Sequence, residues 1–350
     1  MSAVTRVTMV SYDDEPPLGG QGIVLRGLRT ALSARGHIVD TVAGRGDHAL
    51  RYPRVSGRAP LDFSLQLNRH PELIRRLCGD VVHASGGPGG VLLLRECGAP
   101  LVYTAHHTYR QAHGAGSLRR LLSPVEARSY RRASMVLAVS PSTAQAVHLL
   151  GVPRSRVEVL APGVDGPLLA PPPRDPARLL FAGRWETEKG VLDAVTVMRA
   201  VLTGRSQASA AIAGSGRLES EVRRAVAGSP IEILGRVEET RLREEYARAA
   251  LVLMPSLYEG LGLVALEAQA SGALVVGYDV DGLRDAVPQT GLLVAPGDLA
   301  AAVAVCEALI DDPRRREELG TQAESRVRAQ HSWAAVAVRL EQVYSAVVGG

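Results

Sequence analysis

The sequence predicts an α/β protein built from two doubly wound domains. Two observations support this fold class. Short, continuously apolar runs alternate with longer helical patterns from end to end, and a proline-rich stretch interrupts the alternation midway. Continuously apolar strands joined by helices are typical of parallel sheets that are covered on both faces. The 350 residues also suffice for two cores. We therefore expect ligands at the carboxyl ends of the strands.

The first half of the chain predicts one parallel sheet. Its expected strands lie at 6–11, 38–43, 80–85, 100–105, 135–140 and 157–162. Helical patterns intervene, for example at 23–35, 117–132 and 141–150. Residues 1–162 are therefore predicted to form the N-terminal domain.

The middle of the chain predicts a linker. Six of the seventeen residues from 162 to 178 are proline, which excludes regular structure there. We assign the linker to 163–177 and a second domain to 178–330. The strands expected in this domain lie at 178–183, 209–214, 231–235, 251–256, 273–278 and 291–296.

The last segment, 331–350, has the apolar periodicity of a helix. We expect this helix to bury Trp333, Val338 and Val343 or their neighbours.

Composition favours a cytoplasmic globular protein. Hydrophobic residues make up 46% of the chain and charged residues 22%. Cys78, Cys97 and Cys306 lie far apart, which is typical of buried thiols in a reducing compartment and not of a metal site. Neither a signal-peptide core nor a stretch of eighteen apolar residues occurs.

The charge of the chain is unevenly distributed. Residues 1–170 hold 20 arginines and 12 acidic residues, whereas residues 171–350 hold 20 basic and 24 acidic residues. The basic first half indicates an anionic partner, such as a phosphate, a lipid headgroup or nucleic acid. A solvated arginine-rich surface would give the same pattern.

Lys189 is the one lysine among the 40 basic residues. It follows the strand at 178–183 together with Arg184, before a helical pattern that begins at Val191. A lysine is a compact point charge and an arginine a planar fork, and a diphosphate can use both. An exposed cation at the start of a helix would instead be slightly unfavourable. We therefore expect both cations to bind a ligand.

The stretch SLYEGLGLVALEA, 256–268, combines a glycine turn with two carboxylates. If the turn from Gly260 to Gly262 presents backbone N–H groups to a phosphate, Glu267 on the following helix can reach hydroxyl groups of an adjoining ribose. Glu259 would then face whatever lies beyond the phosphates. Two solvated glutamates are the alternative, and they fit poorly beside the apolar run LGLVAL.

Two further candidates lie in the first half. Gly19, Gly20 and Gly22 open the first helix, where glycine lets the backbone approach a phosphate, although tight glycine turns are common. Their spacing matches neither GxGxxG nor GxxxxGK[ST]. His106 and His107 end the strand at 100–105, where substrate is expected, although a surface pair or a structural histidine would look the same.

Taken in order, these motifs resemble the retaining glycosyltransferases of family 4, the group 1 enzymes similar to glycogen synthase and phosphatidylinositol mannosyltransferase. The second half matches through GRWETEKG, AGSGRLE, LGRV, MPSLYEGLGLVALEAQASG and TGLLVAPGD, and the first half through LGGQG, YTAH and VSPST. Glu259 and Glu267 are the ends of the family's Glu-x7-Glu element. One departure is APGVD at 161–165, where the family often has an asparagine before the glycine.

The resemblance implies the GT-B fold, in which two Rossmann-like domains face a cleft and the C-terminal helix crosses back to the N-terminal, acceptor-binding domain. It implies transfer of a hexosyl group from a UDP- or GDP-sugar to a small-molecule, natural-product or lipid-linked acceptor. The catalytic residues would be His106, Arg184, Lys189 and Glu259. The donor-binding residues would be Gly19, Gly20, Gly22, Arg184, Lys189, Gly214, Val237, Glu259, Gly260, Leu261, Gly262, Leu263 and Glu267.

The resemblance also sets expectations for cofactors and partners. No cofactor and no metal is expected, because Arg184 and Lys189 would neutralise the departing diphosphate. The basic first half would favour peripheral association with an anionic membrane, and nucleic acid is not an expected partner. Two alternatives remain: an inactive subunit that binds sugar nucleotides, and a nicotinamide-dependent oxidoreductase, whose glycine spacing is missing.

Overall fold

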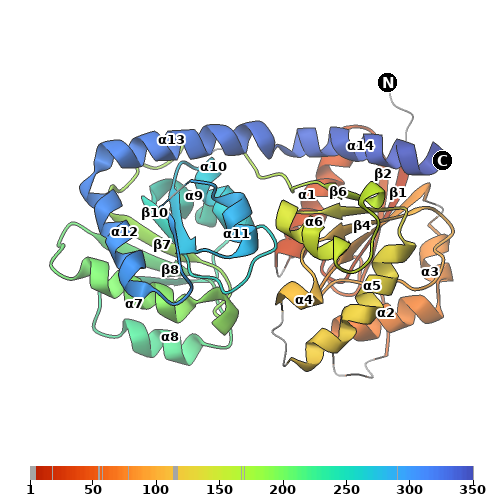
Figure 1. Cartoon of the computed structure of the whole chain (residues 1–350), viewed down its shortest axis with the longest axis horizontal. Coiled ribbons are helices and arrows are strands. Elements are labelled where there is room, and N and C mark those ends of the chain that lie inside the picture. Colours follow the sequence, from red (N-terminus) through yellow and green to blue (C-terminus); the bar gives the residue numbers. More distant parts are fainter. Residues whose placement is uncertain are drawn as a thin grey trace. The chain divides into compact units, whose positions relative to one another are not determined.

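The computed structural model describes residues 5–17, 19–53, 56, 58–77, 79–112, 117–166, 168, 170–289 and 291–349. The chain forms two compact units, each with a six-stranded parallel sheet covered by helices (Figure 1). Unit 1 comprises Met1–Gly163 and Trp333–Gly350, and unit 2 comprises Val164–Ser332. The predicted fold class of two doubly wound α/β domains is confirmed.

Unit 1 contains the first six predicted strands, in the spatial order β2-β1-β3-β4-β5-β6. Their bounds are β1 Arg6–Ser11, β2 Ile38–Ala43, β3 Val81–Gly86, β4 Leu101–Ala105, β5 Met135–Ala138 and β6 Val157–Val159. The helices are α1 Gly20–Ala34, α2 Ala59–Arg69, α3 Glu72–Arg75, α4 Tyr109–Ala112, η1 Leu118–Leu122, α5 Ser123–Arg132, α6 Pro141–His148, η2 Arg154–Arg156 and α14 Trp333–Gly349. The helix expected at 117–132 is divided into the 3₁₀ helix η1 and the α-helix α5.

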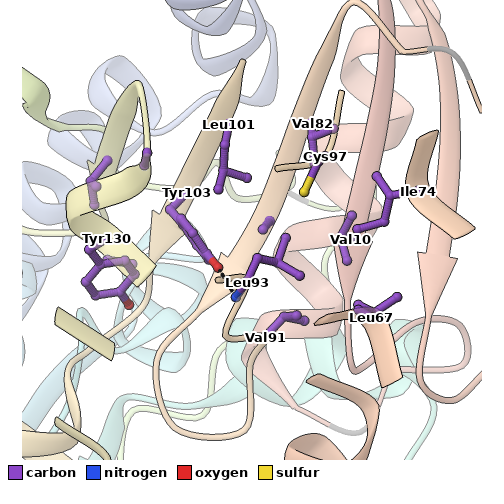
Figure 2. Close-up of a cluster of buried hydrophobic side chains, with 14 of the residues drawn as sticks. Val10, Leu67, Ile74, Val82, Val91, Leu93, Cys97, Leu101, Tyr103 and Tyr130 are labelled. Carbon is purple, nitrogen blue, oxygen red and sulfur yellow. Dashed lines mark hydrogen bonds between the residues drawn. The ribbon is translucent and has the colours of Figure 1, made fainter. Parts of the chain in front are cut away.

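The core of unit 1 lies between its sheet and the helices that cover it. Figure 2 shows part of this core, with Val10, Val82 and Tyr103 among its buried side chains. The hydroxyl group of Tyr103 accepts a hydrogen bond from the backbone N–H of Leu93 (2.8 Å) and contacts Oγ of Ser129 (2.7 Å). Since these partners satisfy the tyrosine oxygen, the ring can be buried completely.

Helix α14 belongs to unit 1 although it closes the chain. Its Tyr344 hydroxyl lies 2.5 Å from Nδ1 of His83 on β3, and its Glu341 accepts a hydrogen bond from Nη2 of Arg35 (2.9 Å). The other ring nitrogen of His83 lies 2.7 Å from Oγ1 of Thr104. Burial lowers the pKa of His83 to about 4, so this histidine is a neutral link between β3, β4 and α14.

The predicted buried stripe of α14 is confirmed at Val343, whereas Val338 is 40% exposed and its neighbour Ala337 is the buried residue. The buried positions are Val336, Ala337, Leu340, Val343 and Tyr344, which recur with the helical period and leave residue 338 on the outer face. Trp333 is half-buried. A Cβ atom at Gly27 would lie 2.1 Å from its ring, so the absence of a side chain on α1 makes room for the indole.

Unit 2 contains the other six strands, in the spatial order β12-β11-β10-β7-β8-β9. Their bounds are β7 Arg178–Ala182, β8 Ser209–Ala213, β9 Ile231–Gly235, β10 Leu251–Met254, β11 Leu274–Tyr278 and β12 Leu293–Val294. The helices are η3 Thr187–Lys189, α7 Val191–Leu202, α8 Glu219–Val226, α9 Glu239–Arg248, α10 Leu263–Ala270, α11 Asp281–Ala286, α12 Leu299–Asp311 and α13 Pro313–Gln330.

The strand order of unit 2 identifies one special place on its sheet. From β7 the chain builds outward through β8 and β9, and from β10 it builds outward in the opposite direction through β11 and β12. Ligands of doubly wound sheets bind beyond the carboxyl ends of the strands at such a switch point. The ends of β7 and β10 are therefore the first place to look for a site.

Three smaller features complete the fold. The described residues between 165 and 177 form no helix or strand. Cys97 and Cys306 are buried free thiols, and Cys78 lies outside the described residues. No helix in the described part of the chain combines the length and the apolar composition needed to cross a membrane.

Candidate functional site

Lys189 and Glu259 meet at the switch point of unit 2. Lys189 ends η3, which follows β7, and Glu259 lies in the loop that follows β10. The lysine Nζ is 2.6 Å from Oε1 of Glu259. The two side chains are 24% and 10% exposed, so this ion pair is only partly screened by solvent. The ammonium group of Lys189 is therefore held beside Glu259 at the sheet edge and is not that of a fully solvated surface lysine.

Close backbone contacts bring these two residues together. Gly190 has φ of 66°, and a Cβ atom there would lie 2.0 Å from the carbonyl oxygen of Pro255. The N–H of Leu257 donates a hydrogen bond to the carbonyl of Glu188 (2.9 Å). Glycine is thus required directly after the lysine, because any side chain would separate η3 from the loop after β10.

The loop from Glu259 to Gly262 ends at the first turn of α10. Gly262, with φ of 83°, is the N-cap residue and supplies no side-chain cap. Backbone N–H groups at an uncapped helix start favour an anion. Gly282 of α11 fixes the same loop, since a Cβ atom there would lie 2.4 Å from the carbonyl oxygen of Glu259. The sequence interpretation had not singled out Gly282, which only the packing of α11 reveals.

Glu267 lies on α10, half-buried, as predicted for the second carboxylate. Its Oε2 accepts a hydrogen bond from the hydroxyl group of Tyr246 on α9 (3.1 Å). Burial, followed by the nearby charge of Glu267, raises the pKa of Tyr246 well above its ordinary value. The tyrosine is therefore a permanent hydrogen-bond donor that orients the carboxylate.

Arg184 belongs to a group of charges around η3. Its side chain is 54% exposed and lies 3.6 Å from Glu188. Glu186 pairs in turn with Arg217, whose guanidinium is 2.6 Å away. Partial burial acts to raise the pKa of Glu186, but the hydrogen bond and charge of Arg217 outweigh it and lower that pKa. Arg217 was missed, although its position in AGSGRLE could have indicated it.

Gly214 and Val237 follow the neighbouring strands β8 and β9. Gly214 has φ of 129°, and a Cβ atom there would lie 1.8 Å from the carbonyl oxygen of Gly183. Its N–H donates to the carbonyl of Gly235 (2.7 Å). Glycine is therefore needed at position 214, because a side chain there would push apart the loops that follow β7 and β8. Val237 is half-buried at the same carboxyl edge.

In unit 1, the glycines of the first loop surround a carboxylate of the chain itself. The N–H of Gly19 donates to Oδ2 of Asp13 (3.1 Å), and a Cβ atom at Gly22 would lie 2.5 Å from the same oxygen. Arg45 pairs with the other oxygen of Asp13. The position of the Asp13 carboxylate therefore explains why residue 22 has no side chain. Gly20 is the first residue of α1.

His106 is buried directly after β4. Within the described part of the chain, its Nε2 has no hydrogen-bond partner. Burial, followed by the neighbouring His107 and His83, lowers the pKa of His106 to about 3. The ring is therefore neutral at physiological pH, and it can accept from or donate to a ligand but cannot supply a charge.

A second glycine-rich turn had escaped the sequence interpretation. It comprises residues 86–90, GGPGG, and begins at Gly86, the last residue of β3. Gly87 has φ of 95°, and a Cβ atom there would lie 2.3 Å from the carbonyl oxygen of His107. Nε2 of Gln21 donates to the carbonyl of Pro88 (3.1 Å). The loops after β1, β3 and β4 therefore gather at the carboxyl edge of this sheet. Four glycines directly after an apolar run were the overlooked signal.

The sequence also contains one overlooked Asp-x-Asp spacing, at Asp279 and Asp281. Arg284 donates to both carboxylates, from Nε to Asp279 (2.8 Å) and from Nη1 to Asp281 (3.2 Å). Among the described residues, no group of three or more histidine, cysteine, aspartate or glutamate side chains is arranged to hold a metal ion.

Comparison with known protein families agrees with this geometry. Residues 18–166 match the family described as Glycosyltransferase Family 4, and residues 176–312 match Glycosyl transferases group 1. The two matches lie in the two halves of the chain, in the order that the motifs predict.

The chain is a family 4, group 1 glycosyltransferase. This membership makes it an enzyme that uses a nucleotide-sugar donor. The transferase is 33% identical over 314 residues to D-inositol 3-phosphate glycosyltransferase 1 of Catenulispora acidiphila, with 77% of this chain and 73% of that protein covered. It is 29% identical over 397 residues to a glycogen synthase of Mycobacterium tuberculosis, covering 99% and 95% of the two chains.

A solved structure shares the fold. Sucrose-phosphate synthase of Thermosynechococcus elongatus superposes with a TM-score of 0.80 at 22% identity, covering 99% of each chain. The GT-B fold expected from the motifs is thereby confirmed.

Proposed function

We propose that this transferase moves a hexosyl group from a UDP- or GDP-sugar to a hydroxyl group of its acceptor, with retention at the anomeric carbon. The observation that carries this proposal is the ion pair between Lys189 and Glu259 at the switch point of unit 2. The pair combines a phosphate-binding cation with a carboxylate for the sugar, at the edge where doubly wound sheets bind nucleotides.

Each charged residue has a separate role in this proposal. Lys189 and Arg184, with the uncapped start of α10, stabilise the negative charge that grows on the diphosphate as the glycosidic bond breaks. Glu259 contacts the transferred sugar, where positive charge develops. Glu267, oriented by Tyr246, binds the ribose hydroxyl groups.

The donor-binding backbone and the first unit complete the assignment. Gly260, Leu261, Gly262 and Leu263 present the loop before α10 to the diphosphate, while Gly214 and Val237 line the neighbouring strand ends. Gly20, the first residue of α1, offers its backbone to phosphate, whereas the N–H of Gly19 is already donated to Asp13. Neutral His106 contacts a sugar hydroxyl group through its unpartnered Nε2. For retention, the acceptor hydroxyl attacks from the face that the diphosphate leaves, and its proton passes to the departing phosphate oxygen.

The proposed reaction needs no metal. The two cations near the diphosphate supply the charge that a metal supplies elsewhere. Arg284 pairs with both carboxylates of the Asp-x-Asp spacing, which supports a structural use for them.

The acceptor is proposed to be a hydroxylated small molecule, a natural product or a lipid-linked group. The names of the relatives, an inositol phosphate glycosyltransferase and a glycogen synthase, show that the family serves very different acceptors. Peripheral association with an anionic membrane, through the basic first half, is part of the proposal.

A thermal-shift screen of UDP- and GDP-sugars tests the donor site. A donor that binds only the folded state, supplied at a concentration of about a hundred times its Kd, adds about 2.7 kcal/mol of stability and raises Tm. We expect one nucleotide series to raise Tm of the wild type and of the control Arg314→Ala, whose side chain is 89% exposed in unit 2. Lys189→Ala should lose most of this shift. A shift that Lys189→Ala retains in full would remove the lysine from the donor site.

A further inference from the structure

The 3₁₀ helix η1 of unit 1 places no side chain fully in the core, although Arg120 and Leu122 are half-buried. None of its five residues, LRRLL, is buried. Leu118 and Leu121 are 76% and 73% exposed, the highest values for large apolar side chains among the described residues. Side chains three residues apart eclipse each other in a 3₁₀ helix, so both leucines project to the same side. Core packing therefore does not explain this apolar pair.

The sequence around η1 carries an unusual excess of arginine. Residues 109–132 contain six arginines and one acidic residue, Glu126. Glu126 is fully buried, and both its oxygens accept hydrogen bonds from the backbone N–H of Tyr109 (3.0 and 3.2 Å). It therefore does not neutralise the surface arginines.

Three arginines of η1 and α5 have no carboxylate partner among the residues that the structure describes. In the described part of the chain, no salt bridge is formed by Arg119, Arg120 or Arg128. Arg58, at the start of α2, lies near enough to act on Tyr109 together with Arg119. Within unit 1, α2 and α5 lie at the margin opposite α14 (Figure 1). Two exposed leucines therefore share η1 with Arg119 and Arg120, and a third arginine, Arg128, follows on α5.

The combination of exposed leucines with arginines that have no carboxylate partner fits one class of anionic partner better than the others. Nucleic acid would use the arginines but leave two leucines exposed to water. A phosphate in solution would likewise leave them without a partner. A lipid surface uses both, because leucine side chains enter the interface while arginines remain at the headgroups.

We propose that η1 and the following helix α5 dock on an anionic phospholipid surface, with Leu118 and Leu121 inserted and Arg119, Arg120 and Arg128 on the lipid phosphates. This docking deepens the membrane association proposed above and, to that extent, rests on the proposed function. It would give the transferase access to an acceptor that resides in the lipid.

Vesicle sedimentation tests this proposal without any glycosyl transfer. The full chain is mixed with phosphatidylcholine vesicles, with and without phosphatidylglycerol. We expect binding to the anionic vesicles alone, weakened by salt. Leu118→Ser/Leu121→Ser and Arg119→Gln/Arg120→Gln should each reduce the partition constant about tenfold or more. Since all four side chains lie on η1, which has no buried residue, Tm of the variants should match the wild type.

Leu149→Ser is the matched control. Leu149 is 70% exposed on the same unit, directly after α6, and its substitution should leave vesicle binding unchanged. Wild-type protein that ignores anionic vesicles would overturn the proposal. So would equal loss in the Leu149→Ser control, or full binding by the Leu118→Ser/Leu121→Ser variant, which would show non-specific charge attraction.

Two further outcomes separate this proposal from its alternatives. Leucine-dependent dimerisation in sedimentation velocity, without vesicle binding, would make the surface a contact between two copies and overturn membrane docking. Donor-induced thermal shifts are measured without vesicles. A normal donor shift with no vesicle binding therefore overturns the docking alone, whereas vesicle binding without any donor shift overturns the proposed function alone.

Discussion

Lys189 shows what single residues reveal before a structure is known. Its singularity in an arginine-rich chain indicated a function, but its partner Glu259 lies 70 positions away. That partnership depends on β7 and β10 being neighbours, which the order of motifs along the chain does not specify. Gly22 shows the opposite case. Its pattern suggested a phosphate, and the structure explains the missing side chain by Asp13.

Removing the charge of each of the two glutamates should change a different kinetic constant. Glu267→Gln should mainly raise the donor KM, because the ribose hydroxyl groups keep their position and charge as the sugar leaves. Glu259→Gln should mainly lower kcat, because positive charge develops on the sugar beside it. Steady-state kinetics with the donor varied measures both. If Glu259→Gln changed only KM while Glu267→Gln abolished kcat, the two roles would be reversed.

At the scale of elements, the strands could be read directly from the sequence. All twelve predicted runs form strands. The central strands are mainly apolar because both faces of the sheet are covered, whereas the edge strands β2 and β6 contain Asp40 and Glu158. Helices at the surface were harder to read. Residues 117–132 looked like one helix, but Pro124 fits the first turn of a new helix, α5, after the exposed η1. Sequence periodicity located the buried stripe of α14 only to within one residue, at Ala337 and not Val338, because the stripe depends on which face meets α1.

Helix α5 also carries a buried carboxyl whose titration should be visible. Burial raises the pKa of Glu126 to about 8, against the lowering effects of the Tyr109 N–H and Arg110. Between its ordinary pKa and about 8, the unfolded chain releases this proton while the folded chain keeps it. The stabilising contribution of Glu126 is therefore complete at low pH and is lost as pH rises through this window.

Glu126→Gln should remove this pH dependence, because the amide oxygen can still accept from Tyr109 but cannot ionise. Each tenfold difference in proton affinity between the folded and unfolded chain corresponds to about 1.4 kcal/mol of stability lost by the wild type. Urea unfolding of both proteins at about pH 5 and about pH 8 compares their stabilities. The wild type should lose a few kcal/mol relative to Glu126→Gln over that range. Parallel curves for the two proteins would contradict the buried, protonated state.

At the scale of the whole molecule, the chain builds two separate sheets and returns to the first. The candidate site residues of each unit lie at the carboxyl edge of its sheet: Lys189, Glu259 and Glu267 in unit 2, and His106 with the GGPGG turn in unit 1. The sequence predicted sites at the carboxyl ends of the strands, although the GGPGG turn had been overlooked. Charge is divided in the same way: the basic first half of the chain lies in unit 1, and the second half, which has an excess of acidic residues, lies mostly in unit 2.

Turnover should survive saturating EDTA, because protein cations take the place of a metal in the proposed site. The variant Asp281→Asn removes one carboxylate of the Asp-x-Asp spacing and should retain turnover, since that side chain is 66% exposed and paired with Arg284. A modest effect of Mg²⁺ on product release would agree with the account. An EDTA-induced loss of turnover that Mg²⁺ or Mn²⁺ restores would contradict it.

The turnover of Lys189→Ala tests the central claim most directly. One electrostatic stabiliser of a leaving group typically contributes about 10²–10³ in rate, so kcat should fall by about that factor while the fold, followed by circular dichroism, stays intact. Lys189→Arg should also be impaired, because a planar fork does not reproduce a point charge at 2.6 Å from Glu259. The control Arg314→Ala should turn over normally. Near-normal kcat in Lys189→Ala would contradict the assignment of the reaction to this edge of the sheet.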